Sequence, residues 1–152
     1  MKKSDYTRST VECRYDELKP AFKENLKIYA ELHKLGDVER EVVQCFTTTN
    51  LKKGFLGRMK TSYTVICMTK RFLFFKILTD KEEPGMGAAQ WIEISEIRDW
   101  EETEMGRMYN DSGIEAFGFL YLSSHRSRWY IGLGRDDAGK KCSTLMKDMI
   151  NL

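Results

Sequence analysis

YTVICMTKRFLFFKI, residues 63–77, is the stretch that decides the fold. β-Branched and aromatic side chains fill it, and such side chains favour strands. The basic dipeptide Lys70-Arg71 divides it into two apolar halves. The stretch therefore predicts two consecutive strands, at residues 61–69 and 71–78, joined by a short turn.

A two-residue alternation extends from this pair across most of the chain. Turn-forming residues interrupt it near residues 54–57, 84–85 and 110–113, where glycine, proline or asparagine occurs. Between these breaks the pattern predicts five further strands, at residues 41–49, 90–94, 96–103, 113–122 and 128–134. We therefore expect seven antiparallel strands in all.

Helical periodicity appears near both ends of the chain. Residues 16–35 carry a helical repeat, and Pro20 suits the first turn of such a helix. The repeat forms two adjacent apolar stripes, Leu18, Phe22, Leu26 and Tyr29 in one and Ile28, Leu32 and Leu35 in the other. We expect so broad an apolar surface to bury at least one stripe on the strands or on a second subunit. Residues 1–13 are polar and are expected to be loosely ordered.

A second helix is predicted over residues 137–150, with Asp136 and Asp137 as its N-terminal cap. It overlaps the motif GRDDAGKK, residues 134–141, which has the G-x-x-x-x-G-K spacing of a phosphate-binding loop. Lys141 stands where such a loop needs Ser or Thr to hold magnesium, and the two aspartates would repel phosphates. We therefore interpret the motif as a helix cap and not as a nucleotide site.

The order of elements is thus helix, seven strands, helix, in a chain of 152 residues, the size of one ordinary domain. This order predicts a mainly β fold of the α+β class. We expect a seven-stranded antiparallel barrel or two orthogonal sheets, capped at one open end by the C-terminal helix. Residues 1–37 would form a polar tail and an extra N-terminal helix, and residues 38–152 the β domain.

Residues 41–152 resemble the pleckstrin-homology (PH) superfold, and most closely the small bacterial PH-like and GRAM-like domains. The resemblance lies in YTVICMTKRFLFFKI followed by WIEISEIRDWEE, where Ile92, Ile94 and Ile97 form a regular step, and in the closing helix. The N-terminal helix lies outside the family core, and the last helix lacks the tryptophan usual in eukaryotic PH domains. The resemblance implies a non-catalytic binding module.

Composition and spacing point away from an enzyme. His33 and His125 stand far apart and no Cys-x-x-Cys occurs, so no metal site is predicted. The four cysteines have no paired spacing, which favours a reducing, cytosolic compartment. Cys45 and Cys67 fall in apolar runs, where we expect them to be small buried hydrophobes. No cofactor, signal peptide or membrane-spanning run is predicted.

Charge is unevenly distributed, although the net charge is only +2. Residues 50–76 contain seven Lys or Arg and no acid, whereas residues 80–104 contain nine acids and two bases. Such asymmetry produces a field that can steer charged partners. The isoelectric point of about 8.3 is nevertheless low for a nucleic-acid-binding domain, so nucleic acid is not the expected partner.

The candidate site is LKKGFLGRMK, residues 51–60, which joins the first two predicted strands. Its glycines free the backbone, and its apolar side chains stand among four cations. The resemblance implies that this loop, the loop between the third and fourth predicted strands and residues 123–128 share the open end of the barrel, where the acids at 80–83 would partly cancel the positive charge. It also implies that basic residues there can bind phosphoinositides, with Lys53, Arg58 and Lys60 at matching positions. The predicted contact residues are Lys52, Lys53, Phe55, Leu56, Arg58, Lys60, Arg126 and Arg128.

Three interpretations of this loop are compatible with the sequence. The leading interpretation is that the domain docks a protein partner. The alternative is peripheral binding to anionic phospholipid or phosphoinositide, in which cations attract the bilayer and Phe55 and Leu56 insert into it. In the third, Phe55, Leu56 and Met59 fold back onto the barrel and the cations only keep the edge soluble. The expected location is the cytoplasm, at a membrane surface if lipid is bound.

Overall fold

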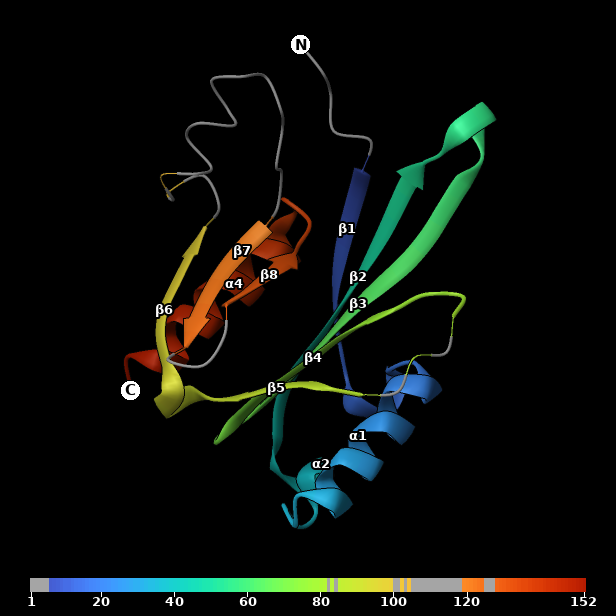
Figure 1. Cartoon of the computed structure of the whole chain (residues 1–152). Coiled ribbons are helices and arrows are strands. Elements are labelled where there is room, and N and C mark those ends of the chain that lie inside the picture. The colour runs from blue at the N-terminus through green and yellow to red at the C-terminus, as the bar shows by residue number, and fades with distance from the viewer. Residues whose placement is uncertain are drawn as a thin grey trace.

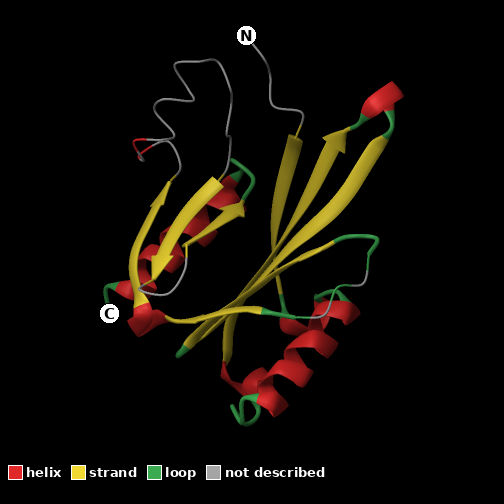
Figure 2. Ribbon diagram, viewed as in Figure 1, coloured by secondary structure: helices red, strands yellow, loops and turns green. Residues whose placement is uncertain are grey.

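The computed structural model describes residues 6–81, 83, 85–99, 102, 104, 119–124 and 128–152 (Figure 1). It is a mixed α+β fold with two antiparallel sheets (Figure 2). The five-stranded sheet has the order β1 (Tyr6–Cys13), β2 (Val42–Lys53), β3 (Met59–Thr69), β4 (Phe72–Leu78) and β5 (Gly87–Gln90). The three-stranded sheet consists of β6 (Ile94–Asp99), β7 (Phe119–Ser124) and β8 (Arg128–Gly132). The helices are α1 (Pro20–Leu32), α2 (Val38–Glu41) and α4 (Asp137–Ile150), with short 3-10 helices η1 (Tyr15–Glu17), η2 (Phe55–Gly57) and η3 (Trp91–Glu93).

The central hairpin of β3 and β4 forms as predicted, with the two strands paired antiparallel. β2, β6 and β8 confirm three of the other predicted strands, with shifted ends. The strand predicted at 90–94 is wrong, because β5 ends at Gln90 and Trp91 begins η3, where its indole N–H is bonded to the carbonyl of Thr69. Most of the strand predicted at 113–122 lies outside the described residues, and its last part belongs to β7.

Residues 6–13 of the N-terminal tail form a strand, which corrects the expectation of a loosely ordered segment for this part of it, while residues 1–5 lie outside the described residues. β1 pairs with β2 along its whole length and ends where Cys13 lies opposite Cys45. The buried hydroxyl of Thr10 shares a hydrogen bond of 2.7 Å with the hydroxyl of Thr48 on β2. A polar strand of this kind is held by hydroxyl and backbone partners, so it lacks the apolar alternation that reveals other strands in a sequence.

The five-stranded sheet carries a hydrophobic core on each face. On one face Phe46 packs with the three-stranded sheet and with Met146 of α4. On the other face α1 covers the strands, and Phe22 packs with Phe74 of β4. Figure 2 shows the two long helices on different sides of the strands. The central strands are therefore buried on both faces, which explains the nearly continuous apolar sequence of β3 and β4.

Helix α1 confirms the expectation that one of its two apolar stripes is buried. Phe22 and Leu26 are fully buried, and Tyr29 of the same stripe is half-buried. Two residues of the second stripe stay in solvent, Ile28 at 49 % and Leu32 at 75 % exposure, whereas Leu35, beyond the end of α1, packs against the same core as Phe22. The helix is thus part of the packed structure, and its outer face presents an apolar pair.

A set of hydrogen bonds joins β1 to the start of α4, and we call it the corner contact. The backbone N–H of Thr10 donates to the Asp136 carboxylate over 2.8 Å, and the N–H of Gly134 donates to the Thr10 hydroxyl over 2.8 Å. Asp136 also accepts from the N–H of Gly139 in the first turn of α4, over 3.0 Å. Asp136 is therefore the predicted helix cap, and α4 confirms the predicted C-terminal helix.

The two sheets do not close into one barrel. Among the described strands, one backbone ladder joins β1 to β5 and a second joins β6 to β8, and none links the two sets. The corner contact connects β1 to the segment between β8 and α4 through side chains instead. Of the two expected arrangements, the closed seven-stranded barrel is therefore wrong. The described strands form two sheets, as in the other expected arrangement, but with eight strands in place of seven.

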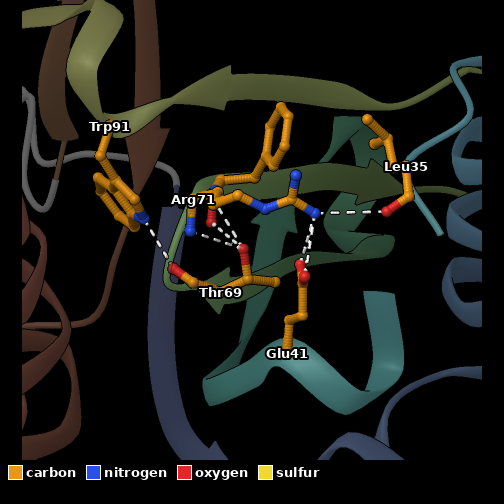
Figure 3. Close-up of polar contacts among 6 residues, drawn as sticks. Leu35, Glu41, Thr69, Arg71 and Trp91 are labelled. Atoms are coloured by element: carbon orange, nitrogen blue, oxygen red, sulfur yellow. Dashed lines mark hydrogen bonds and ion pairs between the residues drawn. The ribbon is translucent and has the colours of Figure 1, made fainter. Parts of the chain in front are cut away.

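The turn between β3 and β4 is held from two sides (Figure 3). Thr69 Oγ1 accepts the backbone N–H groups of Arg71 at 3.2 Å and Phe72 at 2.9 Å. The carbonyl of Thr69 accepts the indole N–H of Trp91 at 2.8 Å. The Arg71 guanidinium binds both carboxylate oxygens of Glu41, at 3.0 and 2.8 Å. This turn therefore ties together α2, the five-stranded sheet and the junction with the three-stranded sheet.

We expect Thr69→Val to lower the free energy of unfolding by about 1–3 kcal/mol. Valine keeps the shape of the fully buried side chain but removes the oxygen that accepts two backbone N–H groups. Urea denaturation measures the loss. Thr61→Val, at an exposed threonine on the same strand, is the matched control and should change stability by less than about 0.5 kcal/mol. Equal effects of the two substitutions would show that the turn does not need this hydroxyl.

Candidate functional site

The candidate site is the end of the β2–β3 hairpin, residues 51–60, which we call the hairpin tip. β4 pairs with β3 only as far as Tyr63, opposite Leu78, whereas β2 and β3 stay paired to Lys53 and Met59. The last residue pairs between β2 and β3 therefore lie beyond the end of β4. Figure 1 shows the tip at the upper right, away from α1 and α4. Its position lets it approach a flat or extended partner without obstruction by the helices.

The tip has a tightly turned backbone that depends on glycine. The N–H of Gly54 donates to the carbonyl of Arg58 over 2.6 Å, and a Cβ at Gly54 would lie 2.8 Å from that oxygen. Leu56 and Gly57 both adopt left-handed conformations, with φ of 60° and 74°. A left-handed leucine costs on the order of 1–2 kcal/mol. Such strain at an exposed turn directs attention to a function for the side chain it presents.

The tip presents apolar side chains and cations together. Leu56 is 83 % exposed and Met59 is 55 % exposed. Lys53, Arg58 and Lys60 are exposed beside them. The alternative in which the apolar residues fold back is therefore wrong for Leu56 and Met59. The side chain of Phe55 falls outside the described part of the structure.

The hairpin tip carries an excess of positive charge. No Asp or Glu occurs between Glu41 and Asp80 in the sequence. In the described residues, no ion pair neutralises Lys53, Arg58 or Lys60. Lys52 is also exposed at the end of β2. Lys53, Arg58 and Lys60 can therefore attract an anionic surface over a long range at low ionic strength.

The backbone of the acidic loop that follows β4 is bonded to Lys76 of that strand. The Lys76 ammonium donates to the backbone carbonyls of Glu83 and Gly85, at 2.5 and 2.7 Å. Lys76 itself lies opposite Val65 of β3, well back from the end of the hairpin. These bonds hold the backbone at Glu83 and Gly85 against β4, and Glu82 of the same loop lies outside the described residues.

The other predicted basic residues do not complete a common site with the tip. Arg128 is the first residue of β8 and lies opposite Ser123, next to the start of β6. Figure 1 shows that end of the three-stranded sheet and the hairpin tip on different sides of the molecule. Arg126 lies outside the described residues. The predicted cluster is therefore reduced to the residues of the tip itself.

The structure also brings together residues that sequence reasoning missed. Cys13, Cys45 and Cys67 lie opposite one another on β1, β2 and β3. Their spacing in the sequence gave no sign of this, because the alignment depends on the pairing register of three strands, of which β1 was not predicted. Within the described residues, no group of three or more His, Cys, Asp or Glu is placed to hold a metal ion. None of the helices described has the length and apolar content that a bilayer crossing requires.

Comparison of the chain with protein-family models, curated proteins and solved structures finds no match. The function of the hairpin tip is therefore argued from the residues that compose it.

Proposed function

We propose that the protein is a non-catalytic, PH-like binding module whose contact element is the hairpin tip. The order of elements supports this proposal: four antiparallel strands β2–β5, three antiparallel strands β6–β8 and a closing helix α4 follow one another along the chain. This is the order that the resemblance to PH-like domains implies. β1 and α1 are additions that cover one edge and one face of the first sheet.

The ligand class that suits the tip best is an anionic membrane surface. The observation that carries this proposal is the exposure of Leu56 and Met59 within a turn whose other described exposed side chains are the cations Lys52, Lys53, Arg58 and Lys60. Each cation close to an anionic bilayer contributes about 1 kcal/mol, and this contribution fades as salt is added. Burial of the two apolar side chains contributes about 25 cal/mol per Å² and is insensitive to salt. The cations thus draw the hairpin tip to the membrane surface, and the apolar side chains then insert into it.

Docking of a protein partner is the second candidate, and the outer face of α1 favours it. Ile28 and Leu32 stand one turn apart on that face and are 49 % and 75 % exposed. An apolar pair on a helix surface is a typical anchor for a partner that lays an apolar groove over it. In this case α1 would be the contact element and the hairpin tip would have an accessory role.

Co-sedimentation with vesicles tests the first candidate. We expect the protein to bind phosphatidylserine-containing vesicles and to ignore phosphatidylcholine vesicles. Lys53→Glu with Arg58→Glu should lower partitioning at about 0.1 M salt by at least tenfold, since about 1 kcal/mol is lost per cation removed. Leu56→Ser with Met59→Ser should keep binding at about 0.1 M salt and lose the fraction that resists about 1 M salt.

Ile28→Ser with Leu32→Ser is the matched control, because it also removes two exposed apolar side chains. This variant should bind vesicles like the parent protein. If instead it loses binding and the tip variant does not, α1 is the membrane contact. If the parent protein ignores anionic vesicles at low salt, the membrane proposal is excluded and the protein-docking candidate stands.

A further inference from the structure

Three cysteines that are distant in the sequence form one row across the five-stranded sheet. Cys13 lies directly opposite Cys45, and Cys45 lies directly opposite Cys67. Residues that face each other in antiparallel strands point to the same side of the sheet, so all three thiols lie on the face that α1 covers. Their neighbours in this core include Tyr15 and Phe74.

The geometry of the row allows two disulfides and excludes a third. Opposite residues of antiparallel strands have Cα atoms about 4.5–5.5 Å apart, within the span of about 4.4–6.8 Å that disulfides occupy. Cys45 can therefore bond to Cys13 or to Cys67 without movement of the backbone. Cys13 and Cys67 are separated by two strand spacings, about 9–10 Å, which is too far for a bond.

The three thiols differ in access and in their contacts. Cys45 and Cys67 are fully buried, and their thiols are hydrogen-bonded to each other. Cys13 is half-buried on the edge strand, and its sulfur contacts Thr47 Oγ1 at 3.6 Å. Both Cys13 and Cys45 border an open groove whose other lining residues include Glu12, Tyr15, Glu17, Val43 and Gln44. A small reagent in this groove meets Cys13 first.

We propose that the row Cys13–Cys45–Cys67 is a redox-modification site that takes a low-molecular-weight disulfide such as oxidised glutathione. The Cys13 thiolate attacks one sulfur of the reagent, forming a mixed disulfide and releasing one thiol. Cys45 gives its proton to water and attacks the Cys13 sulfur, which closes the cross-strand disulfide and expels the second thiol. Two cysteine thiols are thereby oxidised, and one reagent disulfide is reduced to two thiols.

Cys67 allows the disulfide to move from the edge strand β1 to the buried strands β2 and β3. Cys67 can attack the Cys45 sulfur, forming Cys45–Cys67 and releasing Cys13 as a thiol, with no net oxidation or reduction. The new disulfide would lie in the core beneath α1, out of reach of reductants. Cys13 would then act as the entry point and Cys45–Cys67 as the protected product.

Proximity, and not thiol acidity, would drive this reaction. Burial raises the pKa of Cys13, and the hydrogen bond of the Cys45 thiol to Cys67, together with burial, raises the pKa of Cys45. A raised pKa leaves little thiolate, so exchange with the reagent is slow. Once the mixed disulfide has formed, the second thiol is already in place and the closure becomes intramolecular.

Cys142 provides an internal control. It is fully buried on α4, in the core on the other face of the sheet, and burial raises its pKa as well. Cys142 is therefore as deeply buried as Cys45, but it does not belong to the row of cysteines. It should stay reduced under conditions that oxidise the row.

Oxidation of the full chain by oxidised glutathione tests the proposal. After quenching and alkylation, the intact mass should show loss of two of the four thiols within one chain and no retained glutathione. Peptide mapping should find Cys13–Cys45 or Cys45–Cys67, with Cys142 alkylated. Retention of all four thiols, a bond to Cys142, or a Cys13–Cys67 bond would each overturn the proposal.

Two variants make the result specific. Cys45→Ala should retain glutathione on Cys13 without forming a disulfide, because the remaining two row cysteines are too far apart. Cys67→Ala should still close Cys13–Cys45, and it serves if Cys45→Ala does not fold. Disulfide formation between Cys13 and Cys67 in the Cys45→Ala protein would contradict the register on which the proposal rests.

Discussion

Phe22→Ala lowers the free energy of unfolding of the whole chain by about 3–5 kcal/mol, the usual cost of emptying a buried phenylalanine site. Phe22 is fully buried and belongs to the core between α1 and the five-stranded sheet. Alanine is a slightly better helix former than phenylalanine, but that gain is about 0.5 kcal/mol and does not offset the cavity. The large loss follows because α1 is one wall of this core, and not an appendage.

Urea denaturation followed by circular dichroism and by tryptophan fluorescence measures this effect. Trp91 and Trp129 belong to the core on the opposite face of the sheet, so their fluorescence reports unfolding at a distance from α1. Both signals should shift to lower urea together. Leu32→Ala on the exposed face of the same helix is the control and should change stability by less than about 0.5 kcal/mol. A fluorescence transition that stays unchanged in Phe22→Ala would show that α1 unfolds independently.

Gly139→Ala is the second substitution with a large expected effect, a loss of about 3 kcal/mol or more from overpacking. Replacement of a helical glycine by alanine ordinarily stabilises a helix by about 1 kcal/mol. Here a Cβ would overlap the carbonyl of Gly134 and lie 3.1 Å from the Asp136 carboxylate. Gly134 cannot move aside freely, because its N–H is bonded to the hydroxyl of Thr10. Gly139→Ala is therefore expected to lower stability, whereas a glycine-to-alanine substitution within a helix usually raises it.

Thermal unfolding measures this second loss. For a chain of this size, 1 kcal/mol corresponds to about 2–4 °C, so we expect the Tm to fall by about 6–12 °C. Lys140→Ala, at the neighbouring exposed position of α4, is the control and should leave the Tm nearly unchanged. An equal or higher Tm for Gly139→Ala would mean that α4 does not approach Gly134 as closely as described.

The elements that could be predicted from the sequence are those whose signal is local. β3 and β4 are rich in apolar and β-branched residues, and α4 begins at an aspartate cap, so each is recognisable within a short window. The buried stripe of α1 was predictable for the same reason, since its period is visible within four turns. Local patterns of this kind survive folding because burial selects the same residues that create them.

β1 and the end of β5 could not be predicted because distant partners define them. β1 is stable through its pairing with β2 and through the bonds of Thr10 to Gly134 and Asp136. β5 ends where Trp91 turns away to reach the carbonyl of Thr69. Such contacts join residues that no sequence window contains together, and they override local propensity.

In the candidate site, too, the locally encoded part could be predicted and the part that depends on distant contacts could not. Its glycines and cations located the turn correctly, because turn chemistry is a local property. Its separation from Arg128 depends on how the two sheets are joined, and this arrangement has no local signature. The cysteine row likewise appears only when the register of β1, β2 and β3 is known.

The corner contact has a consequence for synthesis of the chain. β1 leaves the ribosome before every other described element, whereas Gly134 and Asp136 lie 124 and 126 positions beyond Thr10. Until they emerge, the outer edge of β1 lacks these partners, and an open strand edge can pair with neighbouring chains. The backbone N–H of Thr10 therefore gains its carboxylate partner only after Asp136 has been synthesised. The corner contact thus completes the packing of the first strand with residues from the end of the chain.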